Sequence, residues 1–468
     1  MIKDTGDNAS SDVPRVPASP SAGGEANGPD QGSGGRASVL LAALAERRPA
    51  LIDLGLERMI MALGALGDPH KNLPPTIHVA GTNGKGSTIA YMRAILQAAG
   101  KTVHVYTSPH LVRFNERIVL AGKEISNEAL IDVITRCDEA VQDQELTYFE
   151  AVTCAAFLAF SETPADVLLL EVGLGGRLDA TNVIRKPLAS VVTPVALDHQ
   201  QFLGDDVATI AGEKAGIFKS GARAVIGQQS ATAMAVLEEQ AMKTGAEPFK
   251  YGEDWHVFEE QGRLVFQDDE GLSDLVLPRL TGAHQINNAG LAIAALRAAD
   301  LCPDDQTVSQ GLVNALWPGR MQQLRFGPFV DRLEAATGDT ADLWLDGGHN
   351  PHAARALASV IADLEERLPR PVYLIAGLQK QKDLGGFFEA LTGLVACVYS
   401  VRSEQDNAAP IKQIEKAARD HGHVVQTAQT ASTALEQILE RIKADKTIPR
   451  VVIAGSLYLA GEILTDHG

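Results

Sequence analysis

A glycine-rich turn follows an apolar segment between residues 77 and 88, where the chain reads Ile-His-Val-Ala-Gly-Thr-Asn-Gly-Lys-Gly-Ser-Thr. Glycines let successive backbone N–H groups converge on phosphate oxygens, and a lysine inside the turn adds a full positive charge. The helix-prone segment 89–97 comes directly after the turn. The spacing Gly-x-x-Gly-Lys-Gly-Ser is shorter than that of the common P-loop. We therefore predict a strand, a phosphate-binding loop and a helix in this region.

Length and composition limit both the fold and the partners. A chain of 468 residues exceeds what one hydrophobic core usually supports, so we expect two domains. The formal net charge of −18 argues against general binding to nucleic acid or to anionic membranes, and no apolar run approaches the length of a membrane span. The four cysteines are scattered in apolar settings, which favours buried thiols in a reducing compartment. We expect a cytoplasmic protein that binds neither nucleic acid nor membrane.

Two α/β patterns follow a polar N-terminal extension. Residues 1–36 are rich in Gly, Ser, Pro, Asp and Ala, so a disordered extension is expected there, with a regulatory docking tail as the alternative. Apolar strand patterns then alternate with helix-length intervals, which predicts a doubly wound, mostly parallel sheet. A short antiparallel patch is expected within 255–277, and a second α/β pattern restarts after Trp317-Pro-Gly-Arg-Met. The predicted strands are 102–106, 166–171, 189–193 and 224–226 in the first pattern, and 343–345, 372–376, 396–400 and 451–454 in the second.

Two polar residues follow predicted strands of the first pattern. Ser108 comes directly after the strand 102–106, and Glu171 closes the all-apolar strand 166–171. Ligands of open α/β sheets lie at the carboxyl ends of the strands, where both residues are expected. A buried carboxylate needs a compensating cation, and Mg²⁺ prefers oxygen ligands and nucleotide phosphates. The pattern favours a magnesium site, while a simple turn at Ser108 and a capping role for Glu171 are the structural alternatives.

His199 and Lys214 follow in the next part of the chain. His199 ends a strand-like segment, and a lone histidine there is more often a hydrogen-bonded structural residue. Lys214 lies in a segment of small residues with helical character. A lysine that faces metal ions would repel them, but carbamylation of its amine would replace the cation with an oxygen anion.

Nine short motifs follow one another along the chain. They are Gly81-Thr-Asn-Gly-Lys-Gly-Ser, Thr107-Ser-Pro-His-Leu, Thr147-Tyr-Phe-Glu, Glu171-Val-Gly-Leu-Gly-Gly-Arg-Leu-Asp-Ala-Thr-Asn, Leu197-Asp-His, Glu213-Lys-Ala-Gly-Ile, Gly282-Ala-His-Gln-Ile-Asn-Asn-Ala, Trp317-Pro-Gly-Arg and Asp346-Gly-Gly-His-Asn-Pro-His. With these motifs in this order, the chain resembles the folylpolyglutamate synthases of the Mur ligase superfamily, and in particular the bifunctional dihydrofolate synthase branch. The resemblance extends from about Ser38 to the C-terminus. Two departures are Gly348, where alanine is usual, and Gln381, where an acidic residue is common.

The resemblance implies a fold and an activity. It implies a P-loop, doubly wound, mostly parallel α/β domain over 37–322 with the ATP and pterin sites, followed by a smaller Rossmann-like α/β domain over 323–468. The implied enzyme is an ATP-dependent ligase that adds L-glutamate to dihydropteroate and to the γ-carboxyl of reduced folates, including polyglutamates, through an acyl phosphate. ATP and two Mg²⁺ ions are the implied cofactors, K⁺ is an open addition, and a monomer is expected. The alternatives are a monofunctional folylpolyglutamate synthase, a cell-wall Mur ligase and a non-catalytic nucleotide switch; a switch would not need the second α/β domain.

The resemblance also implies roles for individual residues. Lys85, His199 and a carbamylated Lys214 would serve catalysis, and Ser108, Glu171 and His199 would hold the metal ions. The residues implied to contact the nucleotide are Asn83, Gly84, Lys85, Gly86, Ser87, Thr88, Asn288, Arg320, Asp346 and His349. The residues implied to contact the pterin substrate are Thr147, Tyr148, Phe149, Glu150, Arg177, Leu178, Asp179 and Ala180.

Overall fold

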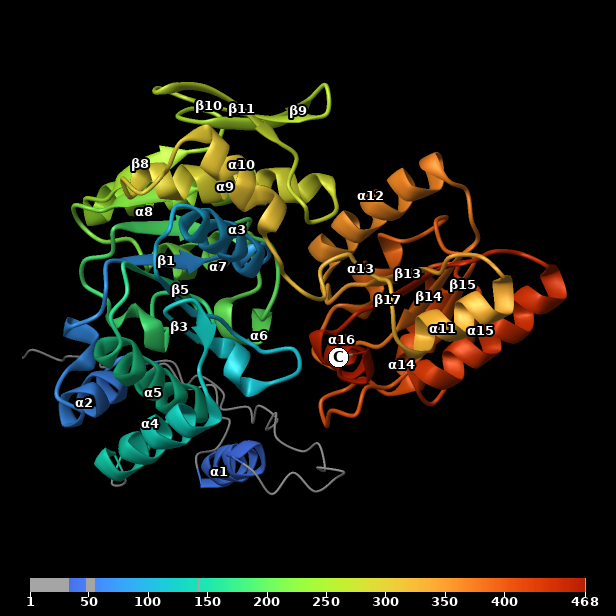
Figure 1. Cartoon of the computed structure of the whole chain (residues 1–468), viewed down its shortest axis with the longest axis horizontal. Coiled ribbons are helices and arrows are strands. Elements are labelled where there is room, and N and C mark those ends of the chain that lie inside the picture. The colour runs from blue at the N-terminus through green and yellow to red at the C-terminus, as the bar shows by residue number, and fades with distance from the viewer. Residues whose placement is uncertain (1–32, 48–54, 142–143, 468) are drawn as a thin grey trace, which may run out of the picture.

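A computed structural model describes residues 33–47, 55–141 and 144–467 of the chain. These residues form two lobes that lie side by side, each built on one mostly parallel sheet with helices on both faces (Figure 1). The N-terminal lobe contains the elements up to α10, and the C-terminal lobe contains those from β12 onward. No helix in the described ranges is both long and apolar enough to traverse a lipid bilayer. The α/β fold class that the sequence predicts is confirmed.

The sheet of the N-terminal lobe has eight strands in the order β4-β3-β2-β5-β1-β6-β7-β8. The six strands from β2 to β8 in this order run parallel, whereas β3 and β4 form an antiparallel edge. All four strands predicted for this region are present. The bounds are β1 (Thr76–Ala80), β2 (Val103–Tyr106), β3 (Ile118–Leu120), β4 (Lys123–Glu124), β5 (Val167–Glu171), β6 (Ala189–Val192), β7 (Arg223–Ile226) and β8 (Glu247–Lys250).

Helices cover both faces of this sheet because successive side chains of a strand point to opposite faces. On β5, Val167 and Leu169 join a core with α3 and α9, whereas Leu168 and Leu170 join a core with α2, α4 and α5. Residues 33–36, which the sequence analysis placed in the N-terminal extension, form the first turn of α1. The rest of that predicted extension, residues 1–32, lies outside the described ranges. The bounds are α1 (Ser33–Arg47), α2 (Glu57–Ala65), η1 (Pro69–Lys71), α3 (Lys85–Ala98), η2 (Phe114–Arg117), α4 (Asn127–Ala140), α5 (Tyr148–Glu162), η3 (Ala180–Val183), α6 (Gln200–Leu203), α7 (Val207–Ala215), α8 (Ala231–Thr244), α9 (Ala283–Ala298) and α10 (Asp305–Asn314).

The predicted antiparallel patch is a three-stranded sheet on the outer side of the N-terminal lobe. Its strands are β9 (His256–Glu260), β10 (Arg263–Asp268) and β11 (Gly271–Val276), with β10 in the middle. Trp255 and Phe266 stack with their ring centroids 5.9 Å apart and join the core shared with α9. The patch therefore belongs to the same hydrophobic core as the large sheet.

The sheet of the C-terminal lobe has the order β12-β13-β17-β14-β15-β16, with only β12 antiparallel. The four strands predicted for this lobe are present, within a residue or two of their expected ends. The bounds are β12 (Gln322–Leu324), α11 (Pro328–Thr337), β13 (Asp342–Leu345), α12 (Pro351–Arg367), β14 (Val372–Ala376), α13 (Leu384–Glu389), β15 (Cys397–Ser400), α14 (Ile411–Asp420), β16 (Val425–Thr427), α15 (Ala431–Asp445), β17 (Arg450–Ala454) and α16 (Leu457–His467).

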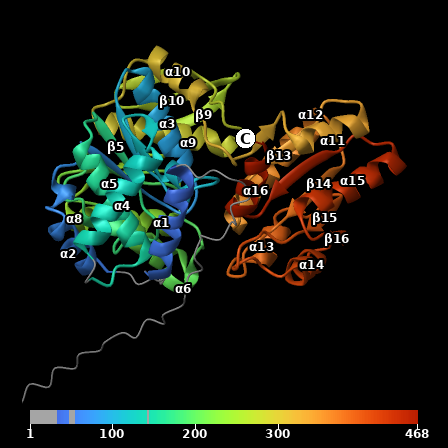
Figure 2. The same cartoon turned by 60° about the horizontal axis from the view of Figure 1, so that its bottom comes forward.

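The two lobes touch where the parallel strands of both sheets end. The loop after β1 hydrogen-bonds to the loop after β13 through Asn83 and Asn350. The loop after β2 also crosses over, since Leu111 packs against the core of the C-terminal lobe near Gly461. Figure 2 shows the same two bodies from a second direction, with α16 at the side that faces the N-terminal lobe. The carboxyl ends of both sheets therefore contribute to one interlobe region.

Candidate active site

The predicted phosphate loop is a four-residue turn between β1 and α3. Gly84 precedes α3 with φ of 91°, a conformation that favours glycine, and a Cβ atom there would lie 2.5 Å from Asn288 Oδ1. A Cβ atom on Gly86 would lie 2.3 Å from Cζ2 of Trp317. The loop is therefore enclosed by α9 on one side and by the Trp317 segment on the other. The structure brings Asn288 to the loop as the motif implied, whereas Trp317 was not among the predicted site residues.

Lys85 and Glu171 meet at the carboxyl end of the sheet. Lys85 Nζ lies 3.7 Å from Glu171 Oε1 and donates to the Gly81 carbonyl oxygen at 3.2 Å. The backbone N–H of Ser108 donates to Glu171 Oε2 at 3.2 Å, so these two predicted metal ligands are adjacent. Burial raises the pKa of Glu171, although the Lys85 charge, the Ser108 N–H and the Arg320 charge oppose it. The buried carboxylate is thus short of positive charge, which a metal ion would supply.

Lys214 reaches the same loop from α7. It lies near the end of α7 with only 4% of its surface exposed, and its Nζ donates to the Gly81 carbonyl oxygen at 3.1 Å. Burial and the nearby Lys85 charge lower the pKa of Lys214 to about 7. A substantial fraction of its amine is consequently neutral at neutral pH, and the neutral amine is the form that reacts with carbon dioxide.

His199 lies on the loop between β6 and α6 with a positive φ of 52°. Its Nε2 is 3.9 Å from Asp198 Oδ1, and 42% of its side chain is exposed. Partial removal from water and the charge of Lys382 lower the pKa of His199. The imidazole is therefore held neutral, which is the form that binds metal ions.

The predicted metal ligands are too few to hold a metal ion by themselves, but they suit an ion that a bound nucleotide also coordinates. Within the described residues, no group of three or more His, Cys, Asp and Glu side chains is assembled for a metal ion. Ser108 supplies a hydroxyl, Glu171 a carboxylate and His199 an imidazole. Thr88 Oγ1, at the start of α3, is also buried without a hydrogen-bond partner among the described residues. These donors suit Mg²⁺ if phosphate oxygens and water complete its shell.

Three further residues implied to contact the nucleotide lie in the hinge, which is the segment 315–321 between α10 and β12, or beyond it in the chain. Arg320 Nη1 donates to the Gly319 carbonyl oxygen at 3.1 Å, and its charge acts on Glu171. Asp346 is 8% exposed and accepts from the backbone N–H groups of Met321, at 2.9 Å, and Gly348, at 2.7 Å. Asp346 therefore fastens the turn 346–348 to Met321 of the hinge. Arg320 is the residue before Met321, and His349 is the residue after this turn.

Two predicted site residues, Asn83 and His349, belong to an interlobe cluster whose other members were not predicted from the sequence. Asp198 Oδ1 accepts from Lys382 Nζ at 2.6 Å, and Asp198 Oδ2 accepts from Asn350 Nδ2 at 3.0 Å. His349 Nε2 lies 3.6 Å from the same Oδ2. Asn83 donates to Asn350 Oδ1 at 3.1 Å and also contacts His352 Nδ1 at 3.0 Å. The sequence offered two signals for the missed residues, because Asp198 precedes His199 in the Leu-Asp-His motif and Asn350 and His352 belong to the motif that begins at Asp346.

The residues implied to bind the pterin are placed differently, because four of the eight already have protein partners through their side chains. Thr147 and Glu150 form a capping box at the start of α5, and Arg58 donates to Glu150 at 3.1 Å. Asp179 is 2% exposed and accepts from the N–H groups of Leu174, at 2.8 Å, and Thr181, at 2.9 Å. The remaining members are Arg177, which pairs with Glu213 at 2.8 Å; Ala180, which is buried; and Tyr148, Phe149 and Leu178, which are half-buried.

The two implied pterin segments nevertheless lie together. A Cβ atom on Gly173, in the loop after β5, would lie 2.3 Å from Cζ of Phe149 at the start of α5. The Phe149 ring centroid is also 6.4 Å from that of Tyr106, the last residue of β2. The ring of Phe149 therefore covers the loop that leads from Glu171 to Asp179.

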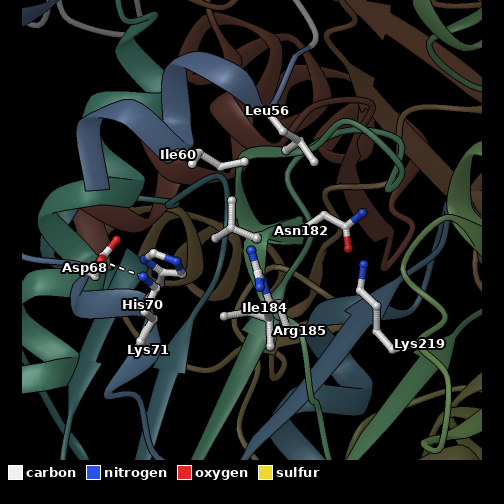
Figure 3. A pocket seen from close by; sticks show the side chains of 10 residues that line it. Leu56, Ile60, Asp68, His70, Lys71, Asn182, Ile184, Arg185 and Lys219 are labelled. Carbon is white, nitrogen blue, oxygen red and sulfur yellow. Dashed lines mark hydrogen bonds and ion pairs between the residues drawn. The ribbon is translucent and has the colours of Figure 1, made fainter. Parts of the chain in front are cut away.

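A surface pocket of about 290 Å³ lies elsewhere on the N-terminal lobe (Figure 3). Lys71 and Arg185 precede β1 and β6, so the pocket is at the amino end of the sheet, opposite the phosphate loop. None of the predicted site residues lines it. Its lining residues are Leu56, Ile60, Asp68, His70, Lys71, Asn182, Val183, Ile184, Arg185 and Lys219. The pocket is therefore separate from the candidate active site.

Comparison with known proteins agrees with this geometry. The family model of the Mur ligase middle domain matches residues 79–296, and that of the dihydrofolate synthetase C-terminal domain matches residues 330–466. A solved structure of a bifunctional folylpolyglutamate synthase/dihydrofolate synthase from Yersinia pestis, with Mn, AMPPNP and L-glutamate bound, superposes with a TM-score of 0.77 at 31% identity. That match covers 92% of this chain and 97% of the other. The fold and the phosphate loop are those of an ATP-dependent ligase of the Mur ligase kind.

Curated relatives narrow this class. The chain is 34% identical to the dihydrofolate synthase/folylpolyglutamate synthase of Escherichia coli over 414 residues, which cover 88% of this chain and 91% of the relative. It is 33% identical to the folylpolyglutamate synthase of Lacticaseibacillus casei over 435 residues, which cover 89% and 95%. The chain belongs to the dihydrofolate synthase/folylpolyglutamate synthase family.

Proposed function

We propose that this ligase uses ATP to join L-glutamate to two acceptors, the carboxylate of dihydropteroate and the γ-carboxylate of reduced folates and their polyglutamates. The observation that carries the proposal is the Lys85–Glu171 pair beside the phosphate loop, whose residue Asn83 also hydrogen-bonds to Asn350 of the C-terminal lobe. A relative named for both activities, the dihydrofolate synthase/folylpolyglutamate synthase of Escherichia coli, supports both acceptors. A monofunctional folylpolyglutamate synthase is the second candidate, because a relative of that name is similarly identical.

The chemistry follows from the weakness of a carboxylate as an electrophile. The acceptor carboxylate attacks the γ-phosphorus of ATP, forms an acyl phosphate and releases ADP. The amine of L-glutamate then attacks the acyl carbon, and the tetrahedral intermediate collapses to an amide and inorganic phosphate. Phosphoryl transfer needs positioning and charge neutralisation more than covalent help from the protein. Lys85, which faces Glu171 at the loop, is the side chain proposed to stabilise the transferring phosphoryl group.

Ser108, Glu171 and His199 are proposed to hold two Mg²⁺ ions, with Glu171 shared between them. When bound, such ions neutralise phosphate charge and orient the triphosphate. Asn288, Arg320, Asp346 and His349 would contact the rest of the nucleotide from α9, the hinge and the C-terminal lobe. Replacing K⁺ by Na⁺ in the assay tests whether potassium is also required.

Lys214 is proposed to be carbamylated in the active enzyme. Its neutral amine attacks carbon dioxide, forms an N–C bond and loses one proton, which leaves an N-carboxylate. The change replaces a buried cation beside Lys85 with an anion. That reversal removes the repulsion between the two lysines and the repulsion of any nearby metal ion.

The acceptor is proposed to bind along the segments that contain Phe149 and Asp179. An aromatic ring at Phe149 offers a face for a flat pterin, and this stacking gives orientation as well as affinity.

The chain is further proposed to act as a monomer in the cytoplasm, with domains at 37–322 and 323–468. The cysteines support a reducing compartment, since they form no disulfide bond among the described residues and three of them are buried.

A phosphate-release screen tests the proposal. Purified protein is given ATP and Mg²⁺ with dihydropteroate or tetrahydrofolate, each with and without L-glutamate, and the amide product is identified by mass. Glutamate-dependent product with both acceptors is expected. Product with tetrahydrofolate alone would make the enzyme monofunctional, whereas no glutamate-dependent product with either acceptor would overturn the proposal.

A further inference from the structure

Asp198 is a buried carboxylate whose two oxygens both accept hydrogen bonds from protein groups. Oδ1 accepts from Lys382 Nζ at 2.6 Å and from the backbone N–H of His199 at 2.8 Å. Oδ2 accepts from Asn350 Nδ2 at 3.0 Å, and His349 Nε2 lies 3.6 Å away. The Asp198 and Lys382 side chains are 9% and 8% exposed. Both oxygens thus accept hydrogen bonds from protein groups, and we treat Asp198 as a residue that acts through these partners.

The donors to Asp198 come from two separate segments of the opposite lobe. Asn350 caps α12 through a hydrogen bond from the Ala353 N–H to its Oδ1 at 2.8 Å, and it follows β13. Lys382 follows β14, just before α13. The Asp198 carboxylate of the N-terminal lobe therefore binds the segments that follow β13 and β14 of the C-terminal lobe.

The same contacts bear directly on the candidate active site. Asn350 also exchanges hydrogen bonds with Asn83 of the phosphate loop, each at 3.1 Å. His199, a proposed metal ligand, is the next residue after Asp198, and its backbone N–H is held by the Asp198 carboxylate. A change at Asp198 would thus reach the phosphate loop, the metal ligand and the C-terminal lobe at once.

We propose that Asp198 is the positioning residue that closes the C-terminal lobe over the phosphate loop, through a buried ion pair with Lys382 and a hydrogen bond from Asn350. The kinetic part of this inference rests on the proposed function. Its physical part, the mutual position of the lobes, does not depend on any activity.

The expected consequence is loss of coupling rather than loss of nucleotide binding. An acyl phosphate hydrolyses in water, so a ligase must exclude water until the amine arrives. Without the Asp198–Lys382 pair, the lobes would open more often while Lys85 and Glu171 stay in place. Phosphate would then be released without amide formation.

The first test compares Asp198→Asn, Lys382→Met and the double variant with the unaltered protein. Each single variant is expected to lower the rate of amide formation roughly tenfold or more and to raise KM for glutamate, while KM for ATP stays within about threefold. Phosphate released per amide formed should rise above one. Because both variants remove the same pair, the double variant should be no worse than either single variant.

Lys250→Met is the matched control. Lys250 is a largely buried lysine of the N-terminal lobe, and its Nζ lies 2.8 Å from Glu238 Oε1. This ion pair is not among the interlobe contacts. Its loss is expected to leave the phosphate-to-amide ratio at one. If Asp198→Asn also kept a ratio of one with an unchanged KM for glutamate, the positioning role would be overturned.

The second test measures the lobes directly by pulsed electron spin resonance. Spin labels are attached through Met242→Cys and Val424→Cys, which are 69% and 55% exposed and lie on opposite lobes, in a Cys302→Ala background. In the absence of substrates, Asp198→Asn should broaden the distance distribution toward longer distances, and Lys250→Met should not. A distribution identical to that of the unaltered protein would contradict the proposal even if the enzyme proved inactive on folates.

Discussion

The phosphate loop and the segments proposed to hold the pterin lie on the same lobe, but their buried polar groups are paired to different degrees. Around the loop, Lys85 and Lys214 both donate to the Gly81 carbonyl, and Glu171 is buried with a raised pKa. Around the pterin segments, Thr147, Glu150 and Asp179 already make the caps of α5 and η3; burial raises the pKa of Asp179 as well, so the regions differ in their hydrogen bonds and not in the direction of this shift. Charge that the fold leaves uncompensated indicates a ligand, whereas charge that the fold satisfies indicates a structural role.

The largest effect is expected at Lys85. Lys85→Ala should leave a folded protein with ligase activity reduced by about 10²-fold or more, because one charge that stabilises the transferring phosphoryl group is lost. Circular dichroism and the initial rate of amide formation measure the two sides of this prediction. Turnover close to that of the unaltered enzyme, with intact ATP affinity, would remove Lys85 from the phosphate site.

Glu171 tests the metal side of the same region. Glu171→Gln should weaken the dependence of the rate on magnesium more severely than His199→Ala, since the carboxylate is proposed to touch both ions and the imidazole only one. Magnesium titrations of the initial rate are the measurement. Unchanged titration curves in both variants would refute the metal roles.

Lys214 gives a prediction with a definite pH direction. Its pKa is lowered to about 7, so the neutral amine becomes the main form as the pH rises through 7. Carbamylation at a fixed concentration of dissolved carbon dioxide should therefore be faster at pH 8 than at pH 6, as followed by ¹³C resonance of the carbamate. Lys214→Ala should lose activity and recover part of it with small carboxylic acids; full activity without them would defeat the proposal.

The smallest effect is expected at the capped end of α5. Thr147→Ala should lower the free energy of unfolding by about 1 kcal/mol, because the Glu150 N–H loses its acceptor, and Thr147→Ser should restore it. Denaturant unfolding measures this change. A rise in KM for dihydropteroate without any change in stability would instead make Thr147 a direct substrate contact and would break the contrast between the two regions.

What could be predicted from the sequence depends on whether a feature is formed by residues that are close together or far apart in the chain. The phosphate loop, the strand ends at Ser108 and Glu171 and the repeated α/β pattern could be predicted because each depends on neighbouring residues. Lys382 could not, because it meets Asp198 across 184 positions of the chain. Trp317 was missed for the same reason, since only the folded chain places its indole against Gly86.

Isotope transfer tests the central claim, that the phosphate loop activates a carboxylate as an acyl phosphate. The enzyme is given ATP, L-glutamate and dihydropteroate whose carboxylate carries ¹⁸O, and the released phosphate is analysed by mass. The account predicts that one ¹⁸O atom from the carboxylate appears in inorganic phosphate for each amide formed. Amide formation with unlabelled phosphate would contradict it.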